Sequence, residues 1–295
     1  AFARVRCYQA ARADHHPMNP HENPPVSPKA MLRSLWHNRE LIEQMVRRDV
    51  LGRYRGSLLG LAWSFFNPVL MLLVYTFVFS GVFKARWSGD GGASDGHAQF
   101  ALVLFVGLIV NGLFAEILNR APALVVGNAN YVKKVVFPLE ILPVVTSGAA
   151  IFHALVSVCV LLLAMLLLNG SVPWTAVLVP FVMIPLVVLA LGCAWFLASL
   201  GVYLRDVGQT IGILTTVLMF LAPVFYPTSA LPEPIRPWLL LNPLTLIIEQ
   251  SRDVLVWGRL PSFAGFAAYS AISAAFAWAG YWWFQRTRKG FADVL

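Results

Sequence analysis

The sequence predicts an all-α integral membrane protein with six transmembrane helices, an N-terminal amphipathic interface helix, and short re-entrant helices between spans five and six. Hydrophobic residues make up 58% of the 295 residues and charged residues only 12%, whereas soluble domains carry about 25% charged residues. No Asp, Glu, Lys or Arg stands between Arg55 and Lys84, or from Ile141 to Leu204. Because about 20 apolar residues cross a bilayer as a helix, both stretches are expected in the membrane.

Residues 1–30 are predicted to be a disordered tail. They contain no apolar core of the kind that a signal peptide needs, and their prolines, the last of which is Pro28, disfavour regular structure. The first transmembrane helix is therefore expected to direct insertion. Residues 1–17 precede Met18 and are either a native leader or a non-native extension.

Residues 31–56 predict an amphipathic interface helix on the cytoplasmic side. Apolar side chains between Leu32 and Val50 recur at helical spacing, and charged side chains such as Glu43 and Arg47 take the other face. A helix of this kind can serve only as an anchor on the membrane surface, or it can also contact a cytoplasmic partner. The pattern leaves both interpretations open.

Residues 57–290 are expected to form the six-helix transmembrane domain, and residues 291–295 a cytoplasmic C-terminal tail. Spans three and four share one uncharged stretch and are expected to turn back at Asn169–Pro173, its only strong turn signal. Asn67–Pro68 interrupts span one, which favours a helix whose freed backbone faces protein or water. The other expected spans are 57–83, 98–118, 207–226 and 263–284.

The placement of basic residues predicts the orientation. Lys and Arg gather before span one, within residues 120–134, at Arg205 and after Phe284, all on one side if the N-terminus is cytoplasmic. Both termini are therefore expected inside. The net charge of +8 follows from this placement and does not indicate nucleic-acid binding.

Catalytic motifs are absent from the sequence. It contains no GxxxxGK[ST] loop for nucleotide phosphates, no HExxH and no GxSxG. Cys7, Cys159 and Cys193 form no CxxC pair, so neither a metal site nor a disulfide framework is expected. His153 stands alone in an apolar run, which is more typical of a packing residue than of a proton relay. The chain is not expected to be an enzyme or to hydrolyse ATP by itself.

The loop between spans two and three lies on the basic side. Asn128 or Asn130 can cap a short helix that carries Lys133 and Lys134. Such a helix suits a force-transmitting contact with a cytoplasmic partner. The alternative is an ordinary cytoplasmic loop whose lysines only set the orientation.

The segment between spans five and six predicts a helix that starts at Asn242–Pro243, with the asparagine as cap and the proline at the first helical position. Glu249, Arg252 and Asp253 are expected on a wet face beside an apolar stripe. Charged residues near membrane depth usually face protein or water, so short re-entrant helices over the outer mouth of a pore are favoured. A helix lying flat on the outer leaflet is the alternative.

Four sequence blocks carry a family resemblance. They are GRYRGSLLGLAWSFFNP at 52–68, NANYVKKVVFPLEILP at 128–143, YLRDVGQ at 203–209 and NPLTLIIEQSRDVLVWG at 242–258. In this order they resemble the permease subunits of type-2 ABC exporters, and within that class the permeases for O-antigen and teichoic-acid polysaccharides.

The resemblance implies a six-helix half-transporter in the inner membrane of a bacterium. It implies a homodimer that binds two copies of a separate ATPase subunit, which would hold ATP and Mg, so that this chain binds no cofactor itself. The implied substrate is a glycan linked to undecaprenyl diphosphate.

The resemblance also implies roles for individual segments. Residues 128–136 would be the coupling helix on the ATPase, Arg205 and Asp206 a second contact, and residues 232–257 the periplasmic gate helices. The coupling residues would be Asn128, Asn130, Tyr131, Lys133 and Lys134. The gate residues would be Asn242, Glu249, Arg252 and Asp253.

The substrate path has candidates of its own. Aromatic side chains suit the apolar faces of sugars, although an aromatic stripe on span one can equally pack against lipid or the next helix. The candidate path residues are Asn67, Tyr75, Phe79, Phe83, Phe225 and Tyr226. A diphosphate group needs cations at the inner interface, and the candidates for it are Arg53, Arg55 and Lys134.

Two other functions remain open from the sequence. One is a type-2 permease for capsular polysaccharide, a drug or a lipid. The other is a membrane-bound glycosyl or polyprenyl-phosphate transferase. A transferase would need an acidic or histidine-rich cluster in a loop, and the inner loops offer only Glu140 and Asp206.

Overall fold

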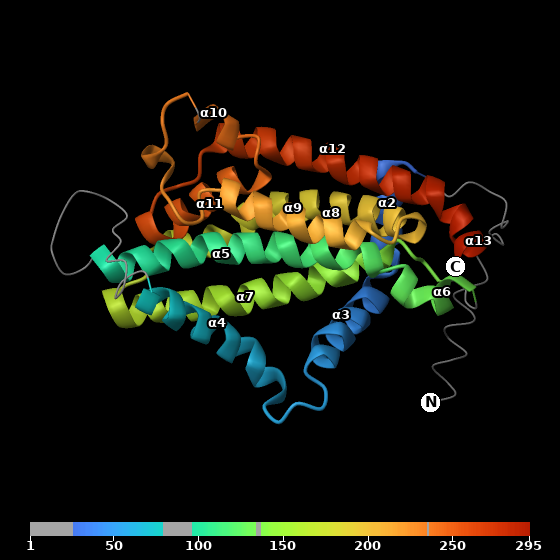
Figure 1. Cartoon of the computed structure of the whole chain (residues 1–295), viewed down its shortest axis with the longest axis horizontal. Helices are drawn as coiled ribbons and strands as arrows, with labels where there is room; N and C mark the ends of the chain where they lie inside the picture. Colours follow the sequence, from blue (N-terminus) through green and yellow to red (C-terminus); the bar gives the residue numbers. More distant parts are fainter. Residues whose placement is uncertain (1–25, 79–95, 134–136, 235) are drawn as a thin grey trace.

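The computed structural model describes residues 26–78, 96–133, 137–234 and 236–295, and every regular element in those ranges is helical. Figure 1 shows the long helices α5, α7, α8 and α12 running along the longest axis, with α3 and α4 forming a V against them. The α-helices are α2 (Pro28–His37), α3 (Arg39–Arg53), α4 (Trp63–Tyr75), α5 (Gly96–Arg120), α6 (Ala129–Lys133), α7 (Ile141–Asn169), α8 (Val179–Tyr203), α9 (Val207–Leu221), α10 (Arg236–Leu239), α11 (Pro243–Arg252), α12 (Phe263–Thr287) and α13 (Phe291–Val294).

Four segments of the described chain are long and apolar enough to cross a membrane. They are Gln99–Ala123, Ile141–Asn169, Trp174–Tyr203 and Phe263–Val294, and shorter apolar helices cover Gly60–Thr76 and Val207–Leu221. The chain is therefore a multi-pass membrane protein with a helical fold, as predicted. The expected spans one and five correspond to the two shorter helices, so the number of six crossings stays a prediction.

Helix α9 ends earlier than the predicted limit of span five at Tyr226. Leu221 is its last residue, and Ala222 is extended with φ −84° and ψ 154°. Pro223 explains this end, because a proline disfavours the helical conformation of the residue before it.

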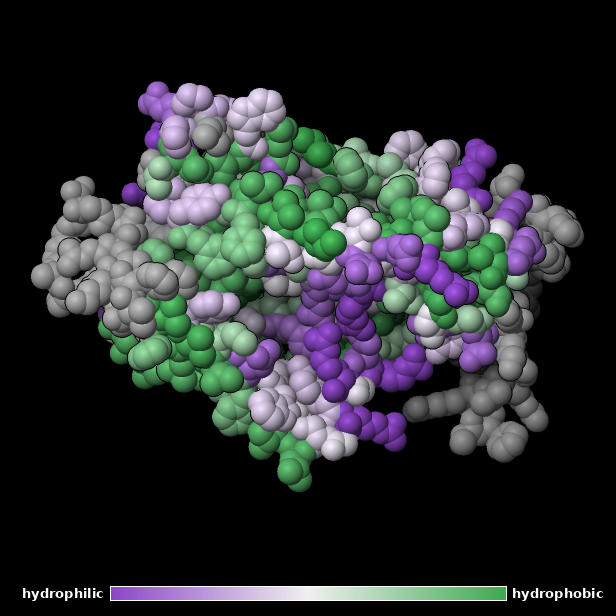
Figure 2. All heavy atoms as spheres, in the orientation of Figure 1, coloured by the Kyte–Doolittle hydropathy of each residue, from purple (hydrophilic) through white to green (hydrophobic). Residues whose placement is uncertain are grey.

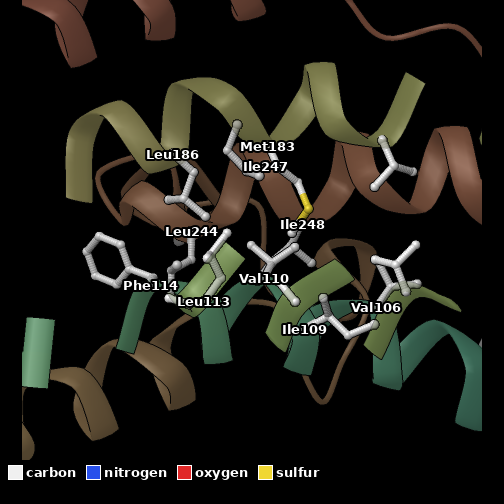
Figure 3. Close-up of a cluster of buried hydrophobic side chains, with 14 of the residues drawn as sticks. Val106, Ile109, Val110, Leu113, Phe114, Met183, Leu186, Leu244, Ile247 and Ile248 are labelled. Atoms are coloured by element: carbon white, nitrogen blue, oxygen red, sulfur yellow. The ribbon is translucent and has the colours of Figure 1, made fainter. Parts of the chain in front are cut away.

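Helix α11 lies between α5 and α8 in the hydrophobic core. Its residues Leu244, Ile247 and Ile248 are fully buried and point toward apolar side chains of α5 and α8 (Figure 3). Between membrane-spanning helices such side chains stabilise the fold mainly through van der Waals packing. The helix is thus an integral part of the core, while its re-entry into the bilayer stays a prediction.

Helices α8 and α12 approach each other through glycine. A Cβ atom added to Gly280 would collide with the carbonyl oxygen of Gly192, and one added to Gly192 would collide with the backbone of Ala277. Close backbone approach at small residues is a common way for helices to associate in membranes. The two glycines therefore set the spacing of this helix pair.

The interface segment forms two helices instead of the single helix predicted for residues 31–56. It starts at Pro28, within the predicted disordered tail, because Ser27 caps the helix and proline is tolerated in its first turn. The helix breaks at Asn38, and α3 ends at Arg53. No residue of α2 is buried, which suits a helix lying on a bilayer surface.

The sequence also makes predictions for the turn after α7 and for the C-terminal segment. The predicted hairpin is confirmed, because α7 ends at Asn169 and Gly170 takes a left-handed φ of 69°. Residues 291–294, in the predicted C-terminal tail, form α13, and Phe291 is completely buried against Phe284. The cytoplasmic location of this tail stays a prediction. An aromatic side chain so close to the chain end has enough apolar surface to dock.

Candidate functional site

A charged network joins the interface helix to the transmembrane helices. Its centre is Glu116 on α5, whose carboxylate lies 2.8 Å from Arg53 Nη2 and 3.0 Å from His153 Nδ1. Arg120, one turn along α5, lies 3.7 Å from the same carboxylate. Arg120 also donates to both carboxylate oxygens of Asp49 on α3 at 2.8 Å. The network therefore ties α3 to α5 by ion pairs, and α7 to both through the His153 ring nitrogen.

Two cavities lie beside this network. The first has a volume of about 470 Å³ and is lined by charged side chains of α3 and α5 together with Asn128 and Thr146. The second, of about 320 Å³, lies among α4, α5 and α7. Arg53 lines both. Figure 2 shows hydrophilic residues gathered over α3 and the hollow beside it, whereas the surface over α4 is mainly apolar.

Glu116 is not among the residues predicted from the sequence, and His153 has a polar partner that its apolar run did not indicate. His153 was predicted to be a packing residue, but its ring nitrogen Nδ1 pairs with Glu116 and its Nε2 is buried with no hydrogen-bond partner among the described residues. A carboxylate inside the predicted span 98–118 was the available signal. Charged groups in spans are rare and need partners.

A second polar centre is formed by Glu140, which is only 7% exposed. Ser34 Oγ donates to its Oε1 at 3.0 Å, and Arg288 Nη1 donates to its Oε2 at 2.9 Å. The indole of Trp195 donates to the backbone oxygen of Glu140 at 2.9 Å. This residue therefore joins α2, α8 and the C-terminal segment at one point.

The predicted coupling segment is held from several sides. Tyr131 on α6 stacks on Phe137 with ring centroids 4.4 Å apart, and its hydroxyl accepts from Arg48 Nη2 at 3.1 Å. Arg288 Nη2 donates to the backbone oxygen of Phe137 at 3.1 Å. The segment is thereby attached to the interface helix and to the C-terminal segment.

The short helix expected in this loop is present as α6, with Asn128 just before it. The Asn128 amide donates back to the Leu124 carbonyl at 2.8 Å. Asn130 lies within α6, which ends at Lys133, and Lys134 lies outside the described residues. Arg205 and Asp206 are exposed in the turn between α8 and α9.

The candidate path residues divide between two places. Asn67 and Tyr75 line the second cavity, while Phe79 and Phe83 lie outside the described residues. Phe225 and Tyr226 lie beyond α9, and neither lines that cavity. The Tyr226 hydroxyl donates to the backbone oxygen of Phe220 at 3.2 Å.

The candidates for the diphosphate group also separate. Arg53 lies at the junction of the two cavities, whereas Arg55 is exposed and lines neither of them. The two side chains diverge because α3 ends at Arg53 and the chain then turns. The structure therefore adds Arg48 and Arg120 to Arg53 at the first cavity.

The predicted wet face of α11 does not include Arg252. Its side chain is only 1% exposed and donates to the carbonyl oxygens of Val103 at 3.2 Å and Val224 at 3.0 Å, and to the Glu249 carboxylate at 3.0 Å. The Val224 carbonyl is available to a side-chain donor because the chain leaves the helical conformation after α9. Glu249 remains part-exposed.

The start of α11 follows the prediction. The Asn242 side chain accepts from the backbone nitrogen of Leu244 at 3.0 Å, and Pro243 takes the first turn. The Asn242 amide also donates to Leu218 at the end of α9 at 2.8 Å. Asp253 begins the short π-helix that follows α11. The cap thus fixes α11 to α9.

The chemistry of the first cavity suits an anion better than a metal. Within the described part of the chain, no three His, Cys, Asp or Glu side chains lie close enough to hold a metal ion. The guanidinium groups that line the cavity are hydrogen-bond donors and cannot act as metal ligands.

Comparisons with known proteins agree with one another. Residues 40–256 match the family described as ABC-2 type transporter. The chain is 28% identical over 267 residues to the O-antigen export system permease protein RfbA of Myxococcus xanthus, covering 90% of this chain and 99% of that relative. It is 24% identical over 223 residues to the protein of the same name from Klebsiella pneumoniae, covering 75% of this chain and 82% of the relative. It is also 24% identical over 227 residues to the polysialic acid transport protein KpsM of Escherichia coli, covering 74% and 82%. Since the family match extends over most of the helical fold, this chain belongs to the ABC-2 type transporter family.

Proposed function

We propose that this chain is the membrane permease subunit of a type-2 ABC exporter for an O-antigen-like polysaccharide. The observation that carries the proposal is the match to a relative named as an O-antigen export permease, which covers 99% of that relative. The absence of a nucleotide phosphate loop from the sequence supports a division of labour. A separate ATPase subunit then binds ATP and Mg, and this chain contributes no catalytic residue.

The proposed assembly is a homodimer in the bacterial inner membrane, joined by two ATPase subunits. Each copy crosses the membrane six times, with both termini cytoplasmic. The basic residues of α3, of the 120–134 segment and of the C-terminal segment support this orientation. The two shorter apolar helices, Gly60–Thr76 and Val207–Leu221, contribute to the first and fifth crossings.

Coupling to the ATPase is assigned to α6 and to the α8–α9 turn. The attachments of Tyr131 to Arg48 and Phe137 support this role, because they make α6 a short, braced element on the basic side. Arg205 and Asp206 offer exposed charges for a second contact. A braced helix passes a displacement on to the elements that hold it.

The substrate proposed is a glycan carried on a lipid diphosphate. Asn67 and Tyr75 line the second cavity and offer a polar and an aromatic contact to sugar. Phe79 and Phe83 continue the same stripe in sequence. Phe225, Tyr226 and the α11 region with Glu249 and Asp253 are assigned to the outer end of the path.

A capsular polysaccharide is the second candidate substrate. The match to a polysialic acid transport protein supports it, at lower coverage than the first relative. The family membership leaves no support for the transferase alternative, since the match is to a transporter family over residues 40–256.

The deciding experiment uses reconstituted proteoliposomes. The permease is co-purified with its proposed ATPase subunit, and movement of lipid-linked glycan to the lumen is measured with and without ATP. We expect ATP-dependent movement from the complex and no ATP turnover from the permease alone. ATP hydrolysis by the isolated chain, after contaminants are excluded, or transport of drugs in preference to glycans, would overturn the proposal.

A further inference from the structure

The first cavity gathers cations from two helices. Arg48 and Arg53 come from α3 and Arg120 from α5, and the cavity has a single carboxylate in its lining, that of Asp49, among the described residues. When Glu116 is added as the partner of Arg53 and Arg120, three permanent cations face two carboxylates. The cavity therefore carries a surplus positive charge, which favours an anion.

The two carboxylates orient the guanidinium groups. Asp49 fixes Arg120 through two bonds of 2.8 Å, and Glu116 fixes Arg53 through one of 2.8 Å. Arg48 is exposed and donates to the Tyr131 hydroxyl. Preoriented guanidinium forks match the geometry of phosphate oxygens, which accept two parallel bonds from one arginine.

The cations are reachable. The side chains of Arg53 and Arg120 are 42% and 30% exposed, and the volume of about 470 Å³ falls within the range of about 300–1,000 Å³ that is typical of small-molecule sites. A phosphate oxygen can therefore approach without disrupting the buried core.

We propose that this cavity is a binding site for a phosphate or diphosphate group, held by Arg48, Arg53 and Arg120. The inference rests on the proposed function, because it places the phosphate end of a membrane-anchored substrate at the inner interface. Arg53 lines both cavities, so a group bound there places the attached sugar beside the second cavity. Asn128 lines the first cavity and directly precedes α6, so a phosphate group bound in this cavity lies next to the proposed coupling segment.

The test is a binding measurement on the purified permease in phosphatidylcholine nanodiscs, titrated with inorganic pyrophosphate by calorimetry. The variants are Arg48→Gln and Arg53→Gln. Their matched controls are Arg47→Gln and Arg55→Gln, which remove the same charge at exposed neighbours that do not line either cavity. We expect saturable binding that weakens at least about tenfold in each cavity variant, as lost charge-assisted bonds predict, and less than about threefold in each control.

A second variant protects the test against misfolding. Arg53→Lys keeps the charge toward Glu116 but loses the fork, and we expect it to retain the thermal stability of the parent while weakening pyrophosphate binding. No saturable binding to the parent chain, or equal weakening in the cavity variants and their controls, overturns the site.

A lipid arm separates the two natural sources of phosphate. Replacing phosphatidylcholine by phosphatidylglycerol points to a bilayer headgroup as the occupant if pyrophosphate binding is lost through competition at Arg53, and excludes the headgroup if binding persists. Both results support a phosphate site. Because the measurement needs neither ATPase nor glycan, the site and the proposed export function can fail separately.

Discussion

Arg288 and Glu140 form an ion pair of 2.9 Å that joins residues 148 positions apart in the sequence. The pair connects the end of α12 to the start of α7, and Arg288 reaches on to the Phe137 carbonyl at 3.1 Å. The C-terminal segment is thereby fastened to the loop that carries α6. Arg288 therefore holds the C-terminal segment against the proposed coupling segment.

Glu140→Gln tests that fastening. The substitution keeps one acceptor oxygen but removes the charge that Arg288 and Ser34 share, so we expect a loss of about 1–2 kcal/mol of stability. Thermal unfolding of the purified permease measures it, with Glu233→Gln at an exposed position as control. An unfolding temperature equal to that of the control would show that the pair contributes nothing to stability.

Arg252→Met tests the buried arginine of α11. The change leaves the carbonyls of Val103 and Val224 without their donor and the Glu249 carboxylate without its cation, and we expect a loss of about 3–5 kcal/mol. Arg259→Gln, at an exposed position, should cost less than about 1 kcal/mol. The measurement is chemical unfolding in detergent. Equal effects in the two variants would contradict a structural role for Arg252.

Gly280→Ala tests the spacing of α8 and α12. An added methyl group collides with the Gly192 carbonyl, so the helices must separate and we expect a loss of about 1–3 kcal/mol. Gly212→Ala is the matched control in α9, where nothing lies within 4 Å of the added carbon. It should stabilise the helix by up to about 1 kcal/mol. We expect the unfolding temperature to fall in Gly280→Ala and to rise in Gly212→Ala. If neither substitution changes it, the close contact between α8 and α12 does not limit the side chain at position 280.

Reversing Lys133 and Lys134 to Glu tests the coupling segment. Like charges placed at a charged interface weaken association without disturbing the apolar core. We expect the ATPase to co-purify poorly while the permease keeps its unfolding temperature. Lys29→Glu, at the exposed start of α2, controls for charge on the same predicted side. Normal association and normal export in the double variant would leave the two lysines with an orienting role only.

Local signals explain which parts of the fold the sequence could predict. The turn at Asn169–Pro173 and the cap at Asn242 depend on residues next to one another, and both are present in the structure. The helix breaks at position 38, which holds neither glycine nor proline. The helical spacing of apolar residues continues across this position, so a single helix was predicted. The side-chain hydrogen bond at the break is local, because the Asn38 side chain donates to the Ser34 carbonyl at 2.8 Å, and asparagine side chains compete in this way with helical backbone bonding.

The candidate site depends on contacts between residues far apart in the sequence, and the sequence alone does not show which residues are partners. Arg252 was assigned to a wet face because its acceptors, Val103 and Val224, lie 149 and 28 residues away. His153 lies 37 residues from Glu116. A charged residue in an apolar stretch predicts that a partner exists, but the identity of that partner comes only from the fold.

The joint between α3 and α4 depends on two glycines. Gly56 and Gly60 both have positive φ, 85° and 50°, and a Cβ on either would meet nothing within 4 Å. Space is therefore available at both positions, but the left-handed backbone that they adopt is costly for any residue with a side chain. Backbone hydrogen bonds from Ser57 to Tyr54 and from Gly60 to Ser57 close the turns between the two helices. The direction in which the chain leaves α3 for α4 is thus set by backbone conformation, whereas the ion pairs Arg120–Asp49 and Arg53–Glu116 set the position of α3 on α5.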